Sequence, residues 1–212
     1  MATHMNARTL LVATRNMNKV REIAAVMEGL GIELRSLRDF PEVPDVAEDG
    51  STFAENAVLK ARAAARATGL PALADDSGLE VDALGGEPGV RSARYAGAGH
   101  DDAANNRKLL LALQGVPPER RTARFRCAMA FVVPLRDGER VEVREGSCEG
   151  RILEEAKGTS GFGYDPLFFY PPLGQTFAEL GIAEKNRFSH RAKALEAIRP
   201  VLVDYFTPAP RP

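Results

Sequence analysis

The sequence predicts an α/β protein with a mixed sheet, parallel early in the chain and antiparallel late. A short apolar run at residues 9–13 precedes a segment with helical spacing and then an alternating run at 32–37, which is a β-loop-α-β opening. Later, the pair Asp137-Gly138 lies between two apolar runs, as in a hairpin. The 212 residues suffice for one full-sized domain or for two lobes that share a core.

The helices follow from apolar spacing and from end signals. Helical spacing covers 20–30, 56–68 and 101–113, and glycine or proline follows each segment. Thr52 and Glu55 have the form of a capping box before the second helix. Ser189 is placed to cap a last helix, which contains Pro200.

The strands follow from alternation and apolar runs. After the opening pair we expect strands at 73–75, 80–84, 125–133, 140–145, 147–153 and 167–170. Residues 40–50 and 85–89 are rich in loop-forming residues. We expect flexible ends at 1–8 and 207–212 and a single domain at 9–206.

Composition excludes several classes of protein. The net charge of -1 gives no basic field for nucleic acid. Two cysteines, Cys127 and Cys148, and three histidines exclude a disulfide framework and a Cys- or His-rich metal site, so any metal should be a hard cation held by carboxylates. Residues 1–6 are too polar for a signal peptide, and no apolar window could span a bilayer. We expect a cytoplasmic protein with free thiols and neither a nucleic-acid nor a membrane partner.

The stretch LADDSGL at residues 73–79 organises the site. An apolar strand should end there, at two carboxylates, a hydroxyl and a glycine. Neighbours on a strand point to opposite faces, so Asp75 and Asp76 should have different roles. By itself the stretch is more typical of an acidic turn.

Residues 14–19 follow the first strand and precede a helix. Thr14, Asn16 and Lys19, beside the positive end of a helix, suit a polyphosphate. An ordinary β-α turn with a solvated lysine fits equally well, and the glycines of a Walker loop are missing.

A second cluster precedes and enters the helix at 56–68. Glu48 could ligate a metal, and Asn56 and Lys60 share one helical face. An acid near a helix dipole and a solvated lysine are the alternatives.

Two late segments suit a base. Phe162 lies between two glycines, which favours a stacking platform over which a ligand can approach the backbone, although a tight turn with a core aromatic also fits. Arg191 falls in the first turn of a helix, against the dipole, which suggests a phosphate or a base edge. His190 lies beside it, and a lone histidine is more often structural. Jointly these stretches describe a nucleoside triphosphate site with Mg²⁺.

The motifs run in a familiar order from about Leu10 to Leu195. They are TRNMNK (14–19), FAENA (53–57) with KA (60–61), ADDSGL (74–79), GGEPGV (85–90), SARY (92–95), GFGYDP (161–166), EK (184–185) and SHR (189–191). In this order they closely resemble the inosine triphosphate pyrophosphatase family, the non-canonical purine NTP (dITP/XTP) pyrophosphatases.

The resemblance implies hydrolysis of ITP, dITP or XTP to the monophosphate and pyrophosphate, which removes these nucleotides from the pools for DNA and RNA. It implies an elongated two-lobed α/β fold, with a central mixed sheet flanked by helices and a cleft between the lobes, and a homodimer. Asp76 would accept a proton and bind Mg²⁺, Glu48 would be a second Mg²⁺ ligand, and Lys60 would stabilise charge in catalysis. The implied substrate-binding residues are Thr14, Arg15, Asn16, Met17, Asn18, Lys19, Ser77, Phe162, Gly163, Tyr164, Asp165, Lys185, His190 and Arg191.

Chemistry suggests how the base is selected. A donor from His190, Arg191 or the backbone would favour a 6-oxo purine over adenine. Guanine must be rejected at its 2-position, and the sequence does not show how. A pyrophosphatase for pyrimidine or modified nucleotides, as in Maf-type proteins, and a nucleotide sensor without turnover are the two open alternatives.

Overall fold

The computed structural model describes residues 8–207, without the side chains of Asn18, Ile182, Ala183 and Asn186. Residues 1–7 and 208–212, which include almost all of the expected flexible ends, lie outside this description. The chain forms two compact units. The first contains residues 8–76, 128–145 and 193–207, and the second contains 77–127 and 146–192. No helix among the described residues is long and apolar enough to cross a membrane.

The strands form one seven-stranded sheet in the order β2-β1-β3-β4-β5-β6-β7. β1 pairs in parallel with β2 and β3, whereas β6 pairs antiparallel with β5 and β7. The mixed α/β class expected from the sequence is therefore confirmed. The strands are β1 (Thr9–Val12), β2 (Glu33–Ser36), β3 (Ala72–Val81), β4 (Thr122–Leu135), β5 (Gly138–Ile152), β6 (Phe168–Tyr170) and β7 (Gln175–Thr176).

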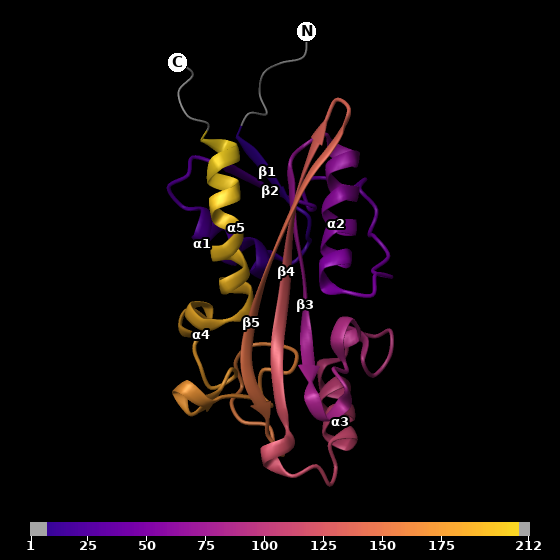
Figure 1. The fold of residues 1–212 in the computed structure, drawn as a ribbon, viewed down its shortest axis with the longest axis vertical. Coiled ribbons are helices and arrows are strands. Elements are labelled where there is room, and N and C mark those ends of the chain that lie inside the picture. Colours follow the sequence, from indigo (N-terminus) through magenta and orange to yellow (C-terminus); the bar gives the residue numbers. More distant parts are fainter. Residues whose placement is uncertain (1–7, 208–212) are drawn as a thin grey trace. The chain divides into compact units, whose positions relative to one another are not determined.

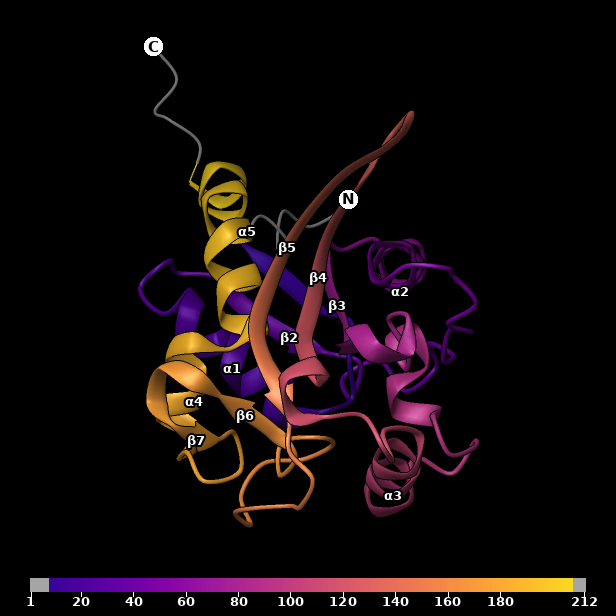
Figure 2. The same cartoon turned by 60° about the horizontal axis from the view of Figure 1, so that its bottom comes forward.

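In the first unit, helices cover both sides of the strands. α1 (Met17–Met27) and α5 (His190–Phe206) lie on one side, and α2 (Phe53–Thr68) lies on the other (Figures 1 and 2). The strand residues between these layers are buried, including Leu10, Leu73 and Phe131. Apolar runs with both faces covered are typical of parallel strands.

Helix α2 is stabilised at both ends. The Glu55 N–H donates to the Thr52 hydroxyl over 3.1 Å, which confirms the expected N-cap. The Glu55 carboxylate accepts from the N–H and the hydroxyl of Ser51. At the other end, Gly69 closes the helix in the left-handed conformation. This helix presents Asn56 and Lys60 from a fixed frame.

In the second unit, α3 (Asp102–Ala112) and α4 (Ile182–Phe188) lie on opposite sides of the strands (Figures 1 and 2). A cluster of buried apolar side chains fills this unit. Phe125 is in contact with Phe168 and Phe177, with ring centroids 4.5 and 5.8 Å away, and Leu109 of α3 is buried in the same cluster.

Several elements differ from the expectations, and residues 82–84, expected in a strand, form a 3-10 helix. The strand does not end at the two aspartates, because β3 runs unbroken from Ala72 to Val81. Helix α4 and the two-residue strand β7 were not expected. The hairpin turn is formed by Arg136-Asp137, one residue earlier than expected, with Gly138 already in β5.

Candidate active site

Strand β3 sends its two neighbouring aspartates in opposite directions. Asp75 Oδ2 lies 2.9 Å from Lys19 Nζ on α1, and Asp76 Oδ1 lies 2.9 Å from Lys60 Nζ on α2. Both side chains are buried. Each carboxylate is paired with an ammonium group, so two acidic residues stay inside a sheet where turn-forming residues would otherwise end the strand.

A polar cluster surrounds Asp76. Lys60 Nζ donates to Asp76 and also to Glu48 Oε1, 2.8 Å away. Asn56 is fully buried, and its amide donates to Asp76 Oδ2 over 3.2 Å while its oxygen accepts the Gly50 N–H over 2.8 Å. Asn56 therefore joins the loop before α2 to the carboxylate.

Burial and neighbouring charges shift the pKa values of Asp76 and Lys60. Burial, aided by the charge of Glu48, raises the pKa of Asp76 and outweighs the charge and hydrogen bond of Lys60. For Lys60, burial lowers the pKa, but the charges of Asp76 and Asp75 and the contact with Glu48 outweigh it, so the pKa is raised. Lys60 is thus held as a cation, and Asp76 is a stronger base than a solvated aspartate.

The donor set near Asp76 fits Mg²⁺. Glu48 and Asp76 supply hard carboxylate oxygens that share the same lysine ammonium. Among the described residues there is no group of three or more His, Cys, Asp or Glu placed to hold a metal. Mg²⁺ typically binds one or two carboxylates and completes its shell with water and substrate phosphates, so two carboxylates suffice.

Of residues 14–19, Thr14, Arg15 and Lys19 line a cavity of about 210 Å³ in the first unit, together with Glu48, Lys60 and Asp75. The Asn16 N–H donates to the Thr14 hydroxyl over 3.1 Å, and α1 begins at Met17, three residues before the expected start. Lys19 therefore lies in the first turn of α1. The side chain of Asn18 is outside the described part of the structure.

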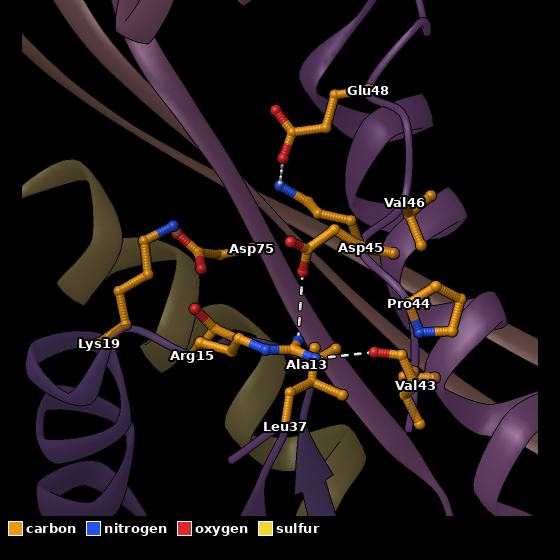
Figure 3. A pocket seen from close by; sticks show the side chains of 13 residues that line it. Ala13, Arg15, Lys19, Leu37, Val43, Pro44, Asp45, Val46, Glu48 and Asp75 are labelled. Carbon is orange, nitrogen blue, oxygen red and sulfur yellow. Dashed lines mark hydrogen bonds and ion pairs between the residues drawn. The ribbon is translucent and has the colours of Figure 1, made fainter. Parts of the chain in front are cut away.

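Arg15 has protein partners within this segment. Its guanidinium donates to the Val43 carbonyl over 2.7 Å and to Asp45 over 3.2 Å (Figure 3). The backbone carbonyl of Arg15 accepts from Arg38. Arg15 thus ties the start of α1 to the loop that leads to Glu48.

A second cavity, of about 120 Å³, lies wholly in the second unit. Phe162 lines this cavity and is 51% exposed, and Lys185 Nζ lies 4.7 Å from the centre of the Phe162 ring. Asp165 is 2% exposed, pairs with Lys185 and accepts the N–H of Phe162 over 3.0 Å. An aromatic ring and a lysine are therefore presented together.

The remaining base-site candidates surround the same cavity. His190 is buried, with its ring 4.9 Å from that of Phe125 and nearly parallel to it. Arg191 is buried in the first turn of α5, as expected, and donates to the Ser77 hydroxyl over 3.2 Å. The Tyr164 hydroxyl donates to the Ser92 carbonyl over 2.8 Å, and burial raises the pKa of this tyrosine.

The candidate residues thus form two sets, one in each unit. Residues 14–19, 48, 60 and 76 belong to the first unit, and residues 77, 162–165, 185, 190 and 191 belong to the second. Asp102 and Asn106 bind Gly163, although neither was predicted as a site residue from the sequence. Their partner lies 61 and 57 residues away, so no local pattern could have revealed them.

Comparison with known proteins bears on both sets. Residues 10–201 match the Ham1 family model. The chain is 58% identical over 188 residues to the dITP/XTP pyrophosphatase of Geobacillus kaustophilus, covering 89% of this chain and 91% of that protein. It is 56% identical over 190 residues to the dITP/XTP pyrophosphatase of Geobacter sulfurreducens, covering 90% and 94%.

Solved structures of proteins with similar sequences superpose on this chain over most of its length. A HAM1 protein from Coxiella burnetii superposes with a TM-score of 0.86 at 43% identity, covering 93% of this chain and 99% of that one. A nucleoside-triphosphatase / dITP/XTP pyrophosphatase from Mycobacterium abscessus gives 0.76 at 47% identity, covering 91% and 99%. These matches span both units, and the chain belongs to the Ham1 family.

Proposed function

We propose that the protein is a pyrophosphatase that hydrolyses non-canonical purine nucleoside triphosphates, ITP, dITP and XTP, to the monophosphate and pyrophosphate. The observation that carries the proposal is the buried cluster of Glu48, Lys60 and Asp76, in a chain whose close relatives bear the name dITP/XTP pyrophosphatase. Removal of these nucleotides would keep them out of DNA and RNA.

The first unit would handle the triphosphate. Asp76, with its raised pKa, would accept the proton of the attacking water. Lys60 and Lys19 would stabilise the negative charge that develops on the phosphates. The N-terminal turn of α1 adds N–H groups that suit phosphate oxygens.

Glu48 and Asp76 would hold Mg²⁺. When bound, the ion would neutralise phosphate charge and make a water more acidic. Lys60, which contacts both carboxylates, would hold them in place and limit their mutual repulsion.

The second unit would recognise the base. Phe162 offers a face for stacking, and the nearby cationic and polar donors are Lys185, His190 and Arg191. Such donors suit the 6-oxo group of hypoxanthine and xanthine and leave the 6-amino group of adenine without an acceptor.

The test is pyrophosphate release with Mg²⁺ from ITP, XTP, dITP, GTP, ATP, dTTP and UTP in parallel. Strong turnover of the first three with little of the rest is expected. Turnover centred on pyrimidines would retain the phosphate chemistry and overturn the base-site assignment. Absence of turnover with any nucleotide would favour a sensor.

We also propose that the protein is a cytoplasmic homodimer, as the family resemblance implies. We propose no membrane partner and no nucleic-acid partner, the latter in keeping with the net charge of -1.

A further inference from the structure

We propose that Asp102 and Asn106 are positioning residues that hold the Phe162 loop and thereby set the affinity for the nucleotide base. This inference rests on the proposed function, because it concerns the same base site. Both residues lie on α3, outside every motif discussed above.

The two side chains bind both polar groups of one residue. The Gly163 N–H donates to Asp102 Oδ2 over 2.7 Å, and the Gly163 carbonyl accepts from Asn106 Nδ2 over 2.9 Å. Residues four apart on a helix share one face, so a single face of α3 reaches both groups. We call Asp102 and Asn106 the Gly163 clamp.

The position of Gly163 makes this contact matter. It follows Phe162 directly and has φ +62°, the left-handed conformation that glycine adopts without strain. Half of Phe162 is exposed, so packing alone does not fix its ring. Its backbone is fixed on one side by Asp165, which accepts the Phe162 N–H, and on the other side by the Gly163 clamp.

The clamp is not explained by the needs of α3. An acid in the first turn favours a helix, and such a role would account for Asp102 alone. However, Asp101 already caps α3, because its carboxylate accepts the Ala104 N–H over 3.0 Å. Asn106 lies in the second turn, where a capping role does not apply. The contact that Asp102 and Asn106 share is Gly163.

The test compares Asp102→Ala, Asn106→Ala and the conservative Asp102→Asn, which keeps an acceptor oxygen. With ITP and Mg²⁺, we expect each alanine variant to raise KM about threefold to tenfold, the effect of one lost hydrogen bond, with kcat near that of the wild type. Asp102→Asn should restore KM to within about twofold of the wild type.

Asp101→Ala is the matched control. It removes the cap of the same helix without touching Gly163, so it should lower thermal stability and leave KM unchanged. Melting temperatures of all variants separate loss of folding from loss of binding.

The decisive measurement combines Asp102→Ala with Phe162→Ala. If the aspartate acts through the ring, Asp102→Ala should raise KM when Phe162 is present and should have no further effect in the Phe162→Ala background. Equal effects in both backgrounds, or a KM that stays at the wild-type value in both clamp variants, would overturn the inference and leave the proposed function intact. A wild-type protein without turnover of any nucleotide would overturn both.

Discussion

At the scale of single residues, the neighbouring aspartates of β3 are each held by a lysine from a different helix, Asp75 by Lys19 and Asp76 by Lys60. Strand alternation correctly predicts that Asp75 and Asp76 point apart. Composition wrongly predicts that the strand ends at them, because a turn-forming residue loses that preference when its carboxylate is buried against Lys19 or Lys60. Those lysines lie 56 and 16 residues away, so their pairing is a tertiary fact.

The first prediction concerns Asp76→Asn. The amide cannot accept a proton, so kcat for ITP should fall at least about a hundredfold, the usual contribution of a general base. Nucleotide binding should persist, because Lys19 and the residues of the second unit are unchanged. Single-turnover kinetics and equilibrium titration with ITP would measure the two effects.

Asp137→Asn in the exposed hairpin turn is a control with the same chemical change. It should keep wild-type turnover. Undiminished turnover in Asp76→Asn would remove Asp76 from the mechanism.

Phe162→Trp tests the stacking role directly. The chain contains no tryptophan, so the new indole would be its sole such fluorophore. A ring that is half exposed in the wild type should change its emission when a base stacks on it. Titration with ITP should shift or quench the fluorescence, whereas pyrophosphate should not, and identical responses to both would contradict the stacking role.

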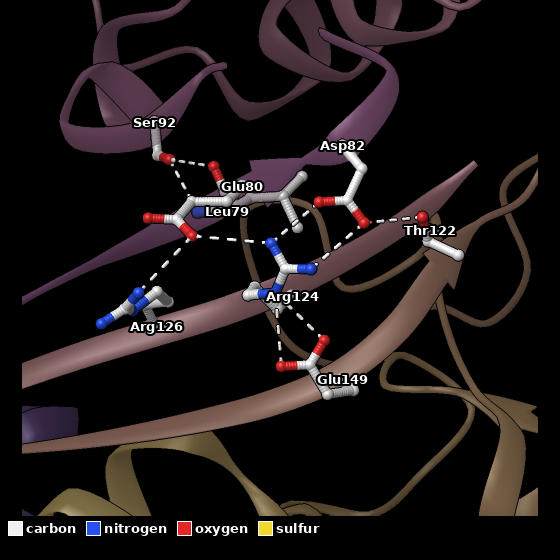
Figure 4. Close-up of polar contacts among 8 residues, drawn as sticks. All are labelled: Leu79, Glu80, Asp82, Ser92, Thr122, Arg124, Arg126 and Glu149. Atoms are coloured by element: carbon white, nitrogen blue, oxygen red, sulfur yellow. Dashed lines mark hydrogen bonds and ion pairs between the residues drawn. The ribbon is translucent and has the colours of Figure 1, made fainter. Parts of the chain in front are cut away.

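The hydrogen bonds of Asp82 predict how the stability of the protein depends on pH. Its pKa is lowered by a hydrogen bond from Thr122 and then by Arg124, which also reaches Glu149 on β5 (Figure 4). A lowered folded-state pKa adds stability above the unfolded value near 3.8, and this stability is lost as pH falls below it. Asp82→Asn should therefore be less stable than the wild type at pH 7, by about 0.5 kcal/mol for so exposed a group, and equally stable near pH 2. Urea unfolding at both pH values would check this, and a difference that persists at the lower pH would refute it.

At the scale of elements, helix α2 and the loop before it are connected by hydrogen bonds and ion pairs that hold Asp76 and Glu48. Thr52 begins the helix, Asn56 binds both the loop and Asp76, and Lys60 joins Asp76 to Glu48. The capping box and the shared face of Asn56 and Lys60 were visible in the sequence. The contact from Asn56 to Gly50 was not, since it depends on how the loop folds back.

Gly50→Ala should disrupt the contacts between this loop, Asn56 and Asp76. A Cβ at that position would lie 2.7 Å from Asn56 Oδ1 and 2.8 Å from Glu55 Cβ, so Asn56 must move and its hydrogen bond to Asp76 weakens. We expect kcat to fall about tenfold, in line with the loss of about one hydrogen bond, with a lower melting temperature. Steady-state kinetics with ITP and thermal unfolding would measure both.

Gly99→Ala is the matched control, because nothing lies within 4 Å of its added Cβ and its φ is not left-handed. It should behave as the wild type. Full activity in Gly50→Ala would show that the contact between Asn56 and Asp76 is dispensable.

Helix α4 shows another limit of sequence reasoning. It spans seven residues, shorter than the length at which helical periodicity is informative. The Glu184-Lys185 motif within it was recognised through the family resemblance, which implies that Lys185 binds substrate. Its burial against Asp165 became visible only once both elements were folded.

At the scale of the whole molecule, the sequence predicted the α/β class, and the family match confirms the resemblance read from the ordered motifs. Assembly is a further prediction. Size-exclusion chromatography with light scattering should give about twice the chain mass of 22.9 kDa if the homodimer forms. A mass equal to that of one chain at micromolar concentration would contradict it.

The division of the chain between the units has a consequence for evolution. The boundary passes between Asp76 and Ser77, and the chain crosses it again after residues 127, 145 and 192. No single cut in the gene would release the part that carries the proposed base-site residues, so recombination could not readily exchange it for another. New base preferences in such a protein should therefore arise by point substitutions around a phosphate-handling centre that stays in place.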